Sequence, residues 1–222
     1  MRPCSENYNI LGHKTIFHDY SFWDNEIKFA NNVANYLTSM WRYKDGNNRS
    51  LIENEEAIYT LTSSIAISSD RIYASAVCFD RNKFQARRQF CPYAFKNSSG
   101  DPLIVRDLGR FNDYLTPHYV QMKQDNNTYI KHKFIWWHVG KKYLSNATQL
   151  QQNTVYFDKN LDYLATNGLN VSALNGEYFN ITSKYIPVSF GKWTTPYYDC
   201  FGGITWVISY LVPFFDEADK YL

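Results

Sequence analysis

The sequence predicts an α+β domain in which a long N-terminal helix packs against an antiparallel sheet. Apolar residues recur at steps of three and four from Trp23 to Trp41, which is the spacing of one helix face. Alternating residues follow within 72–90, and the most β-prone run of the chain is Ile204–Val212. Helices that precede a group of strands in this order are typical of α+β domains.

The composition is that of a globular domain. The 222 residues suffice for one large domain with a core, and 23 basic against 21 acidic residues give a formal charge of +2. Because these charges are scattered, no nucleic-acid-binding surface is indicated. No apolar run is long enough to cross a membrane. Aromatic residues make up 18% of the chain; we expect most of them in the core, with the wall of a pocket as the alternative.

Two helices are expected in the N-terminal third. Residues 1–20 are irregular and form a tether. The first helix begins near Ser21, the expected N-cap, with Asp24 completing a capping box, and it ends before Lys44–Ser50. The second helix is expected over Asn54–Ala66, because two glutamates in its first turn match the helix dipole.

A β-hairpin is expected next. Its strands are Ile72–Phe79 and Phe84–Phe90, joined by a turn at Asp80–Lys83. Farther along, the sequence indicates a short strand and turn within Leu103–Leu115 and a loop at Asp125–Thr128.

The C-terminal half is less regular. Lys131–Leu144 fits a helix or a strand, and the polar segment Asn146–Asn180 is expected to form turns and loops before a short strand, Lys184–Phe190. In Ile204–Val212 both alternating faces are apolar, so we expect a central strand covered on both sides, which Pro213 ends.

Glycosylation and cysteine usage favour the secretory pathway. The cysteines form an even set without CxxC spacing, which favours disulfides over metal binding. No signal peptide is present, so the chain is expected to be part of a longer protein. Six sequons are found, at Asn48, Asn97, Asn126, Asn146, Asn170 and Asn180, nearly all in segments expected to be loops.

The sequence offers little support for an enzyme. The five histidines lack the spacing of a zinc site, and no nucleophile elbow, phosphate loop or paired carboxylates are found. We therefore expect no metal, no cofactor and no catalysis. Arg87 and Arg88 are adjacent on a predicted strand and point to opposite faces, which favours a solvated edge over an anion site.

The segment Lys192–Cys200 carries the strongest functional signal. It is a polar turn, rich in aromatic residues, that runs into the predicted central strand. Turns at the rim of a sheet are common places for ligand pockets. The carboxylate of Asp199 could pair there with a ligand ammonium, and the alternative is an ordinary turn aspartate that caps its own backbone.

The element order, Trp193–Asp199 and the run Trp206–Asp216 resemble the Cache (PAS-like) family of extracellular sensor domains. In that family a W-S-x-P-Y turn precedes a strand that ends in V-P-V-Y-D. The chain is most similar to the Cache ectodomains of the metabotropic glycine receptor and its retinal paralogue, orphan-type class C G-protein-coupled receptors. Ile72–Ser75 matches an Ile-Tyr-Arg-Gly-Ser stretch there. The likeness is good over 51–80 and 190–213 and weak over 96–185.

The resemblance implies a single domain over residues 1–222. The helices would occupy 21–70 and the sheet with its insertions 71–222, without the strand that closes the sheet in the family. It implies a position on the extracellular side of the plasma membrane, attached to the membrane-bound remainder of the chain. A small amine or amino acid is the implied ligand, and a homodimer is left open. The alternative is a non-sensing scaffold, as in the auxiliary subunits of voltage-gated calcium channels.

The resemblance also implies which residues contact the ligand. Ala74 stands where the glycine-binding member has an arginine for the ligand carboxylate, and Phe134, beside Lys133, stands at a second family arginine. Glycine should therefore bind weakly and amines better, unless Lys133 or Arg71 supplies the positive partner. The expected ligand-binding residues are Tyr73, Ser75, Tyr197 and Asp199. The alternative is a place in the core for the two tyrosines and an ordinary strand position for Ser75.

Two disulfides are expected. The resemblance implies that Cys4 pairs with Cys200, which leaves Cys78 with Cys91. A two-residue turn at Arg81-Asn82 would set Cys78 about 20 Å from Cys91 at strand spacing. The second bond therefore requires a wider loop or a bulge.

Overall fold

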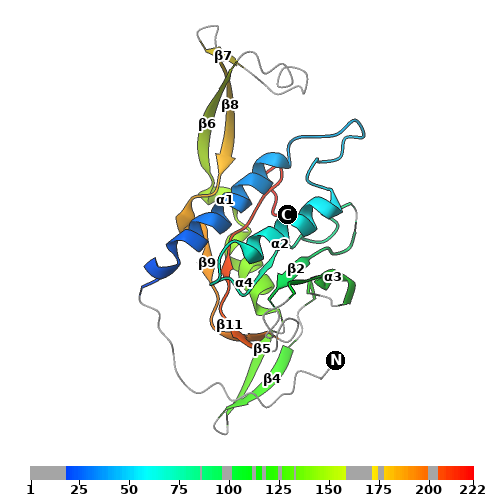
Figure 1. The fold of residues 1–222 in the computed structure, drawn as a ribbon, viewed down its shortest axis with the longest axis vertical. Coiled ribbons are helices and arrows are strands. Elements are labelled where there is room, and N and C mark those ends of the chain that lie inside the picture. The colour runs from blue at the N-terminus through cyan, green and yellow to red at the C-terminus, as the bar shows by residue number, and fades with distance from the viewer. Residues whose placement is uncertain are drawn as a thin grey trace.

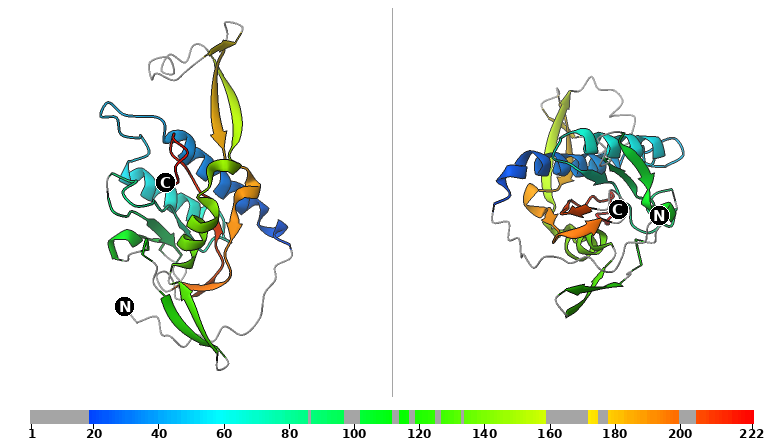
Figure 2. Two further views of the ribbon diagram at one scale, coloured as in Figure 1. Left: turned by 180° about the vertical axis from the view of Figure 1, so that it is seen from behind. Right: turned by 60° about the horizontal axis from the view of Figure 1, so that its bottom comes forward.

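The computed structural model describes residues 19–85, 87–96, 102–111, 114–116, 119–124, 127–132, 134–158, 172–174, 178–199 and 205–222. Within these ranges the chain is an α+β domain whose strands pair only in the antiparallel sense, which confirms the predicted class at this level. A long ribbon extends from one end of a central body and a shorter hairpin from the other (Figures 1 and 2). None of the described helices combines the length and the hydropathy of a membrane span.

The long helix α1 (Asp24–Met40) has the predicted apolar face, but its start differs from the prediction. Ile27, Ala34 and Leu37 are buried along it. A short 3-10 turn, η1 (Ser21–Trp23), precedes the helix, and no side chain caps it. The expected capping box at Ser21 is therefore wrong, because Ser21 lies before the helix and its N–H is taken by Asp19 Oδ1 at 2.8 Å.

The second helix, α2 (Glu55–Ile67), confirms its prediction to within one residue at each end. Asn54 is the N-cap, and its Oδ1 accepts a hydrogen bond from the Ala57 N–H at 3.0 Å. Ile58, Thr62 and Ala66 form the buried face, one helical turn apart, and the helix packs on the sheet beside it. The sequence therefore specified this helix through a cap and a periodic face together.

The sheet beside α2 consists of β1 (Ala74–Ala76), β2 (Pro92–Phe95) and β3 (Ile104–Asp107), with β2 in the middle. Ala76 lies opposite Tyr93, and farther along the hairpin Phe79 bridges to Phe90. The predicted strand Phe84–Phe90 is wrong. Instead the connection runs from residue 80 to residue 89, with Phe84 turned back on Arg87 in a tight bend.

That wide connection has aromatic side chains that fold into the core. Phe79, Phe84 and Phe90 are fully buried, and ring centroids lie 4.9 Å apart for Phe79 and Phe84 and 4.1 Å apart for Phe84 and Phe90. Trp41 and Phe214 complete the ring cluster around Phe79. The apolar alternation of this segment therefore arose from loop residues that reach the core, and not from a strand.

The pairing of Ala76 with Tyr93 and of Phe79 with Phe90 places Cys78 opposite Cys91, and these two cysteines form a disulfide. The expected bond is therefore present, and the wider loop it required is the one just described. Cys4 and Cys200 lie outside the described residues, so their pairing stays a prediction.

The middle of the chain forms extended structure where loops were expected. β6 (Gln151–Asp158) pairs along its length with β8 (Tyr178–Tyr185), and β7 (Ser172–Leu174) adds to β8. The expectation of turns and loops throughout Asn146–Asn180 is wrong, because backbone pairing holds this ribbon, and the side chains at 151–156 and 158 are exposed. An apolar pattern was therefore not available to reveal it.

The remaining elements settle several open alternatives. The segment Lys131–Leu144 is mainly the helix α4 (Ile135–Leu144), preceded by the end of a hairpin of β4 (Tyr119–Gln124) and β5 (Asn127–His132). Part of the loop expected at Asp125–Thr128 thus belongs to β5. β3 is followed by a single helical turn, α3 (Leu108–Phe111), and α4 by the 3-10 turn η2 (Ala147–Gln149).

The base of the ribbon is fastened to α1. The N–H of Ile186 donates to Asn35 Oδ1 at 2.7 Å, and the Ile186 carbonyl accepts from the Asn31 and Asn35 amides at 2.9 and 3.0 Å. The strand expected at Lys184–Phe190 accordingly ends at Tyr185, and the chain turns into the 3-10 helix η3 (Val188–Phe190).

The predicted central strand is divided. β11 (Thr205–Val207) pairs with β10 (Tyr197–Asp199), whereas β12 (Tyr210–Leu211) pairs with β9 (Lys192–Trp193). The break lies at Ser209, whose N–H bonds to the Thr194 hydroxyl at 3.0 Å and whose carbonyl accepts from the Thr194 N–H at 2.8 Å. The described strands therefore form several small sheets, and the expectation of one antiparallel sheet with a central strand is wrong.

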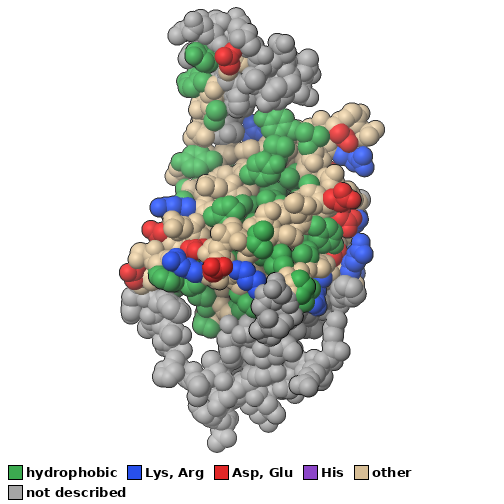
Figure 3. Space-filling model, viewed as in Figure 1, with side chains coloured by type: hydrophobic (Ala, Val, Ile, Leu, Met, Phe, Trp, Pro, Cys, Tyr) green, Lys and Arg blue, Asp and Glu red, His purple; other side chains and the backbone are tan. Residues whose placement is uncertain are grey.

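Hydrophobic side chains gather on the face formed by α1 and α2, with most charges toward its borders (Figure 3). Tyr36 on α1, Ile67 on α2 and Leu51 between the helices are about half exposed or more. A face of this kind would bury apolar surface in contact with another chain. A homodimer stays a prediction.

Candidate ligand-binding cavity

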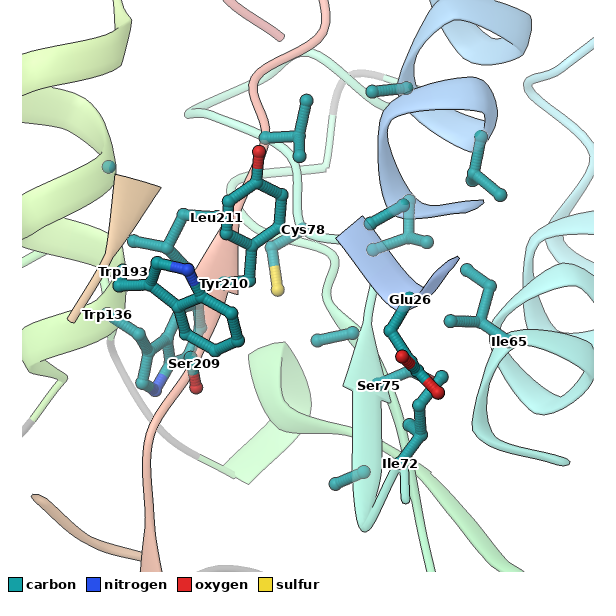
Figure 4. Close-up of a pocket in the computed structure, with 18 of the residues that line it drawn as sticks. Glu26, Ile65, Ile72, Ser75, Cys78, Trp136, Trp193, Ser209, Tyr210 and Leu211 are labelled. Atoms are coloured by element: carbon teal, nitrogen blue, oxygen red, sulfur yellow. The ribbon is translucent and has the colours of Figure 1, made fainter. Parts of the chain in front are cut away.

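A cavity of about 610 Å³ lies between α1, β1, α4 and the C-terminal strands. Figure 4 shows Glu26, Ile72 and Ser75 on one side of it and Trp136, Trp193 and Tyr210 on the other. The volume falls within the range of small-molecule sites. Its two walls come from separate elements of the chain, since no strand pairing within the described ranges joins β1 to the C-terminal strands.

Aromatic rings dominate the wall formed by α4 and the C-terminal strands. Four of the six tryptophans line the cavity, namely Trp23, Trp136, Trp137 and Trp193, and of these Trp137 also belongs to a core cluster. The Trp193 ring stacks on Tyr20 with centroids 5.0 Å apart and meets Tyr210 at 5.2 Å. Such ring faces attract cations as well as apolar groups.

Two charged residues, Glu26 and Arg71, occur in the described part of the lining. Glu26 Oε1 accepts a hydrogen bond from the Ser69 hydroxyl at 2.7 Å, and Oε2 lies 3.7 Å from Arg71 Nη1. The hydrogen bond from Ser69 and, to a smaller extent, the charge of Arg71 hold the pKa of Glu26 below its usual value, against the opposing effect of desolvation. The carboxylate is therefore ionised at neutral pH.

Arg71 has partners outside the cavity. Its Nη1 donates to the Phe22 carbonyl at 2.9 Å, and the guanidinium lies 4.2 Å from the centre of the Phe22 ring. The Arg71 side chain is 43% exposed, compared with 13% for Glu26. The negative charge is thus the better shielded of the two, and the positive charge lies at the solvent side.

The structure brings three of the four predicted ligand-binding residues to the cavity lining, namely Tyr73, Ser75 and Tyr197, together with Ala74. The Ser75 hydroxyl donates to the Thr62 carbonyl of α2 at 2.6 Å. The hydroxyls of Tyr197 and Ser209 are 2.7 Å apart, and burial raises the pKa of Tyr197. These hydroxyls already serve the protein, so their contribution to a ligand is mainly shape.

The fourth predicted residue, Asp199, lies behind the lining. It is 7% exposed, and its Oδ2 accepts a hydrogen bond from the hydroxyl of Tyr93, a lining residue, at 2.5 Å. Burial, and next the negative charge of Asp199, raise the pKa of Tyr93, so this phenol stays protonated and keeps donating. Direct contact of Asp199 with a ligand stays a prediction.

Gly191 sets the position of one aromatic wall residue. A Cβ built at Gly191 would overlap the Tyr210 ring, and the Tyr210 hydroxyl donates to the Val188 carbonyl at 3.0 Å. Only a glycine permits this close approach.

We expect Gly191→Ala to displace Tyr210 from the wall and to destabilise the domain by about 1–3 kcal/mol, the usual cost of overpacking. Thermal unfolding of the variant provides the measurement. Gly46→Ala is the matched control, because a Cβ there meets nothing within 4 Å. Equal melting temperatures for both variants would contradict the assigned packing of Tyr210.

The sequence reading missed Glu26, although a signal was present. Glu26 is three residues after Trp23 and four before Ala30, so it lies on the apolar stripe of α1. A single carboxylate within an apolar helix face is unusual, since a charge there must face either a partner or a cavity.

The other predicted residues fall as follows. Asn48 and Asn146 are exposed outside strands, as a glycosylation site requires, whereas Asn180 lies within β8, so its expected loop position is wrong. Arg87 forms an ion pair with Glu55 on α2, and its guanidinium lies over the Phe90 ring, so this side chain holds the loop against the helix. Asn97, Asn126, Asn170 and Lys133 lie outside the described residues.

The chain matches no protein-family model, no curated protein and no solved structure. The function therefore has to be argued from the cavity and from the sequence.

Proposed function

We propose that this domain is the extracellular, Cache-type ligand-binding domain of a membrane receptor, G-protein-coupled, that senses a small amine or amino acid. The observation that carries the proposal is the cavity of about 610 Å³ between the long helix and the C-terminal strands. Tyr73, Ser75 and Tyr197, for which the sequence resemblance implied ligand contacts, are in its lining. The disulfide and the sequons support an extracellular position.

Signalling would proceed by a population shift. One wall of the cavity belongs to α1 and β1, and the opposite wall to α4 and the C-terminal strands. A ligand that contacts both walls favours the spacing at which both contacts form. The change would pass to the membrane-attached remainder of the chain.

One observation favours a second function, that of a non-sensing scaffold. Ala74 lines the cavity at the position of the family arginine and offers only a methyl group to a ligand carboxylate. A receptor for glycine would thus lack a charged contact worth about 1.5–3 kcal/mol. The scaffold proposal predicts that no small molecule changes the stability of the domain.

Isothermal calorimetry separates these functions. We expect glycine to bind at least tenfold more weakly than an amine that lacks a carboxylate, because one charged contact corresponds to roughly ten- to a hundredfold in affinity. Asp199 holds the hydroxyl of Tyr93 in the lining, so Asp199→Ala should weaken amine binding. Asp70→Ala, at an exposed position, should not. Tight glycine binding that Asp199→Ala leaves unchanged would show that the site is wrongly placed. If calorimetry detects no binding of any amine or amino acid, the result would favour the scaffold function.

A further inference from the structure

One oxygen of the Glu26 carboxylate accepts no hydrogen bond from the described residues. Oε1 is satisfied by the Ser69 hydroxyl at 2.7 Å. Oε2 is buried and accepts no hydrogen bond from the described residues, and its nearest cation, Arg71 Nη1, is 3.7 Å away. A buried, ionised oxygen without a donor is costly, so a donor supplied by a ligand would be strongly favoured there.

The groups near this oxygen suit a cation better than an anion. The described cavity lining has one guanidinium, that of Arg71, which is held outward by the Phe22 carbonyl and ring. The Ser75 hydroxyl donates to Thr62. Beside Glu26, a ligand carboxylate would therefore have to take Arg71 or Ser75 from its present partner, whereas a ligand ammonium would not.

The rest of the cavity defines the body of the ligand. Apart from Glu26, Arg71 and a few small polar side chains, the lining consists of aromatic rings and of aliphatic side chains such as Ile27 and Leu211. A volume of about 610 Å³ exceeds what glycine or methylamine would fill. Apolar area buried on this surface adds to the charge contact, so a larger apolar body would bind more tightly.

We propose that Glu26 is the anionic anchor of the cavity and that its ligands are protonated amines that carry an aromatic or branched apolar body. This inference rests on the proposed function and narrows its ligand class. The ammonium donates to Glu26 Oε2, and the body lies between the aromatic wall and α1. Arg71 competes with the ligand for Glu26, because its Nη1, 3.7 Å from Oε2, is the cation nearest to the same oxygen.

Three probes that share one phenethyl body test the charge requirement on the unaltered domain. These are phenethylamine, 2-phenylethanol and 3-phenylpropionate, which present an ammonium, a hydroxyl and a carboxylate on one apolar body. Calorimetry should give the amine an affinity at least tenfold above that of the alcohol, with the carboxylate weakest. Equal affinities for the three would overturn the proposal while leaving a ligand-binding domain in place.

Substitutions then test the anchor. Glu26→Gln keeps the shape and an acceptor for Ser69, and should weaken phenethylamine at least tenfold while leaving 2-phenylethanol unchanged. Glu56→Gln, on the exposed side of α2, is the matched control and should change neither. Arg71→Gln should strengthen phenethylamine binding by removing the competing cation. Weaker amine binding in Arg71→Gln, or an equal loss of both probes in Glu26→Gln, would overturn the proposal.

Binding to the unaltered domain also shows whether only the proposed ligand class is wrong or the proposed function as well. If phenethylamine and its two analogues all fail to bind while smaller amines or amino acids bind, the proposed class of ligand is wrong and the proposed function survives. If no amine or amino acid binds at all, the proposed function fails with it. Circular dichroism of Glu26→Gln reports folding, and Glu26→Asp, which restores the charge, should recover part of the amine affinity.

Discussion

Phe79→Ala is expected to lower the free energy of unfolding by about 3–5 kcal/mol, the range for a fully buried aromatic side chain. Phe79 has no exposed surface, and its ring contacts those of Trp41, Phe84 and Phe214 at centroid distances of 6.0, 4.9 and 5.2 Å. Its backbone carbonyl also accepts the Tyr114 hydroxyl at 2.6 Å. The cavity left by the substitution would lie where loop, sheet and C-terminal segment meet, so few neighbours can collapse into it.

Urea unfolding followed by tryptophan fluorescence measures this effect. In thermal unfolding, each kcal/mol of lost stability should lower the melting temperature of a domain of this size by roughly 2–4 °C. Ile67→Ala is the control, because Ile67 is 64% exposed and should change stability by no more than about 0.5 kcal/mol. A loss of under 1 kcal/mol in Phe79→Ala would contradict the position of Phe79 at the centre of the core.

Removal of the Cys78–Cys91 disulfide is expected to cost about 3 kcal/mol. The two cysteines are 13 residues apart, and in the chain-entropy model a loop of this size restricts the unfolded chain by about that amount. Cys78 also lines the cavity, so the double variant Cys78→Ala/Cys91→Ala should bind amines more weakly. Chemical denaturation and calorimetry of the double variant provide both values.

A reductant added to the same double variant gives an independent reading. The variant retains Cys4 and Cys200, which we expect to be bonded to each other. If this expectation holds, reduction should lower its stability further. Unchanged stability of the double variant relative to the oxidised wild-type domain would contradict a role for the Cys78–Cys91 bond in holding the hairpin.

The helices could be predicted from the sequence because their signals are local. The apolar stripe of α1 extends from Ile27 to Leu37, and Asn54 caps α2 with its own side chain. The strands could not, because their partners are far away in the chain. On β6 the side chains at 151–156 and 158 are exposed and mark no core-facing side, and the run around Ser209 changes strand partners where a distant residue, Thr194, binds its backbone.

The cavity could be located only in part from the sequence. The resemblance pointed to Tyr73 and Tyr197, which lie in the lining. It also pointed to Asp199, which reaches the lining only through Tyr93, a residue from another strand. The apolar stripe of α1 marks Glu26 as an unusual position, but its partners Ser69 and Arg71 lie more than forty positions later in the chain, and only the structure brings them together.

The hydrogen bonds from Asn31 and Asn35 to the Ile186 backbone couple the orientation of the ribbon to that of α1. The helix that lines the cavity with Ile27 and Ala34 also holds the base of β8 through three hydrogen bonds. Strands of eight residues reach roughly 25 Å, so a tilt of α1 by about 6° moves the far end of such an arm by about 2.5 Å. A small displacement of α1 at the cavity would thus become a larger displacement at the outer end of the ribbon.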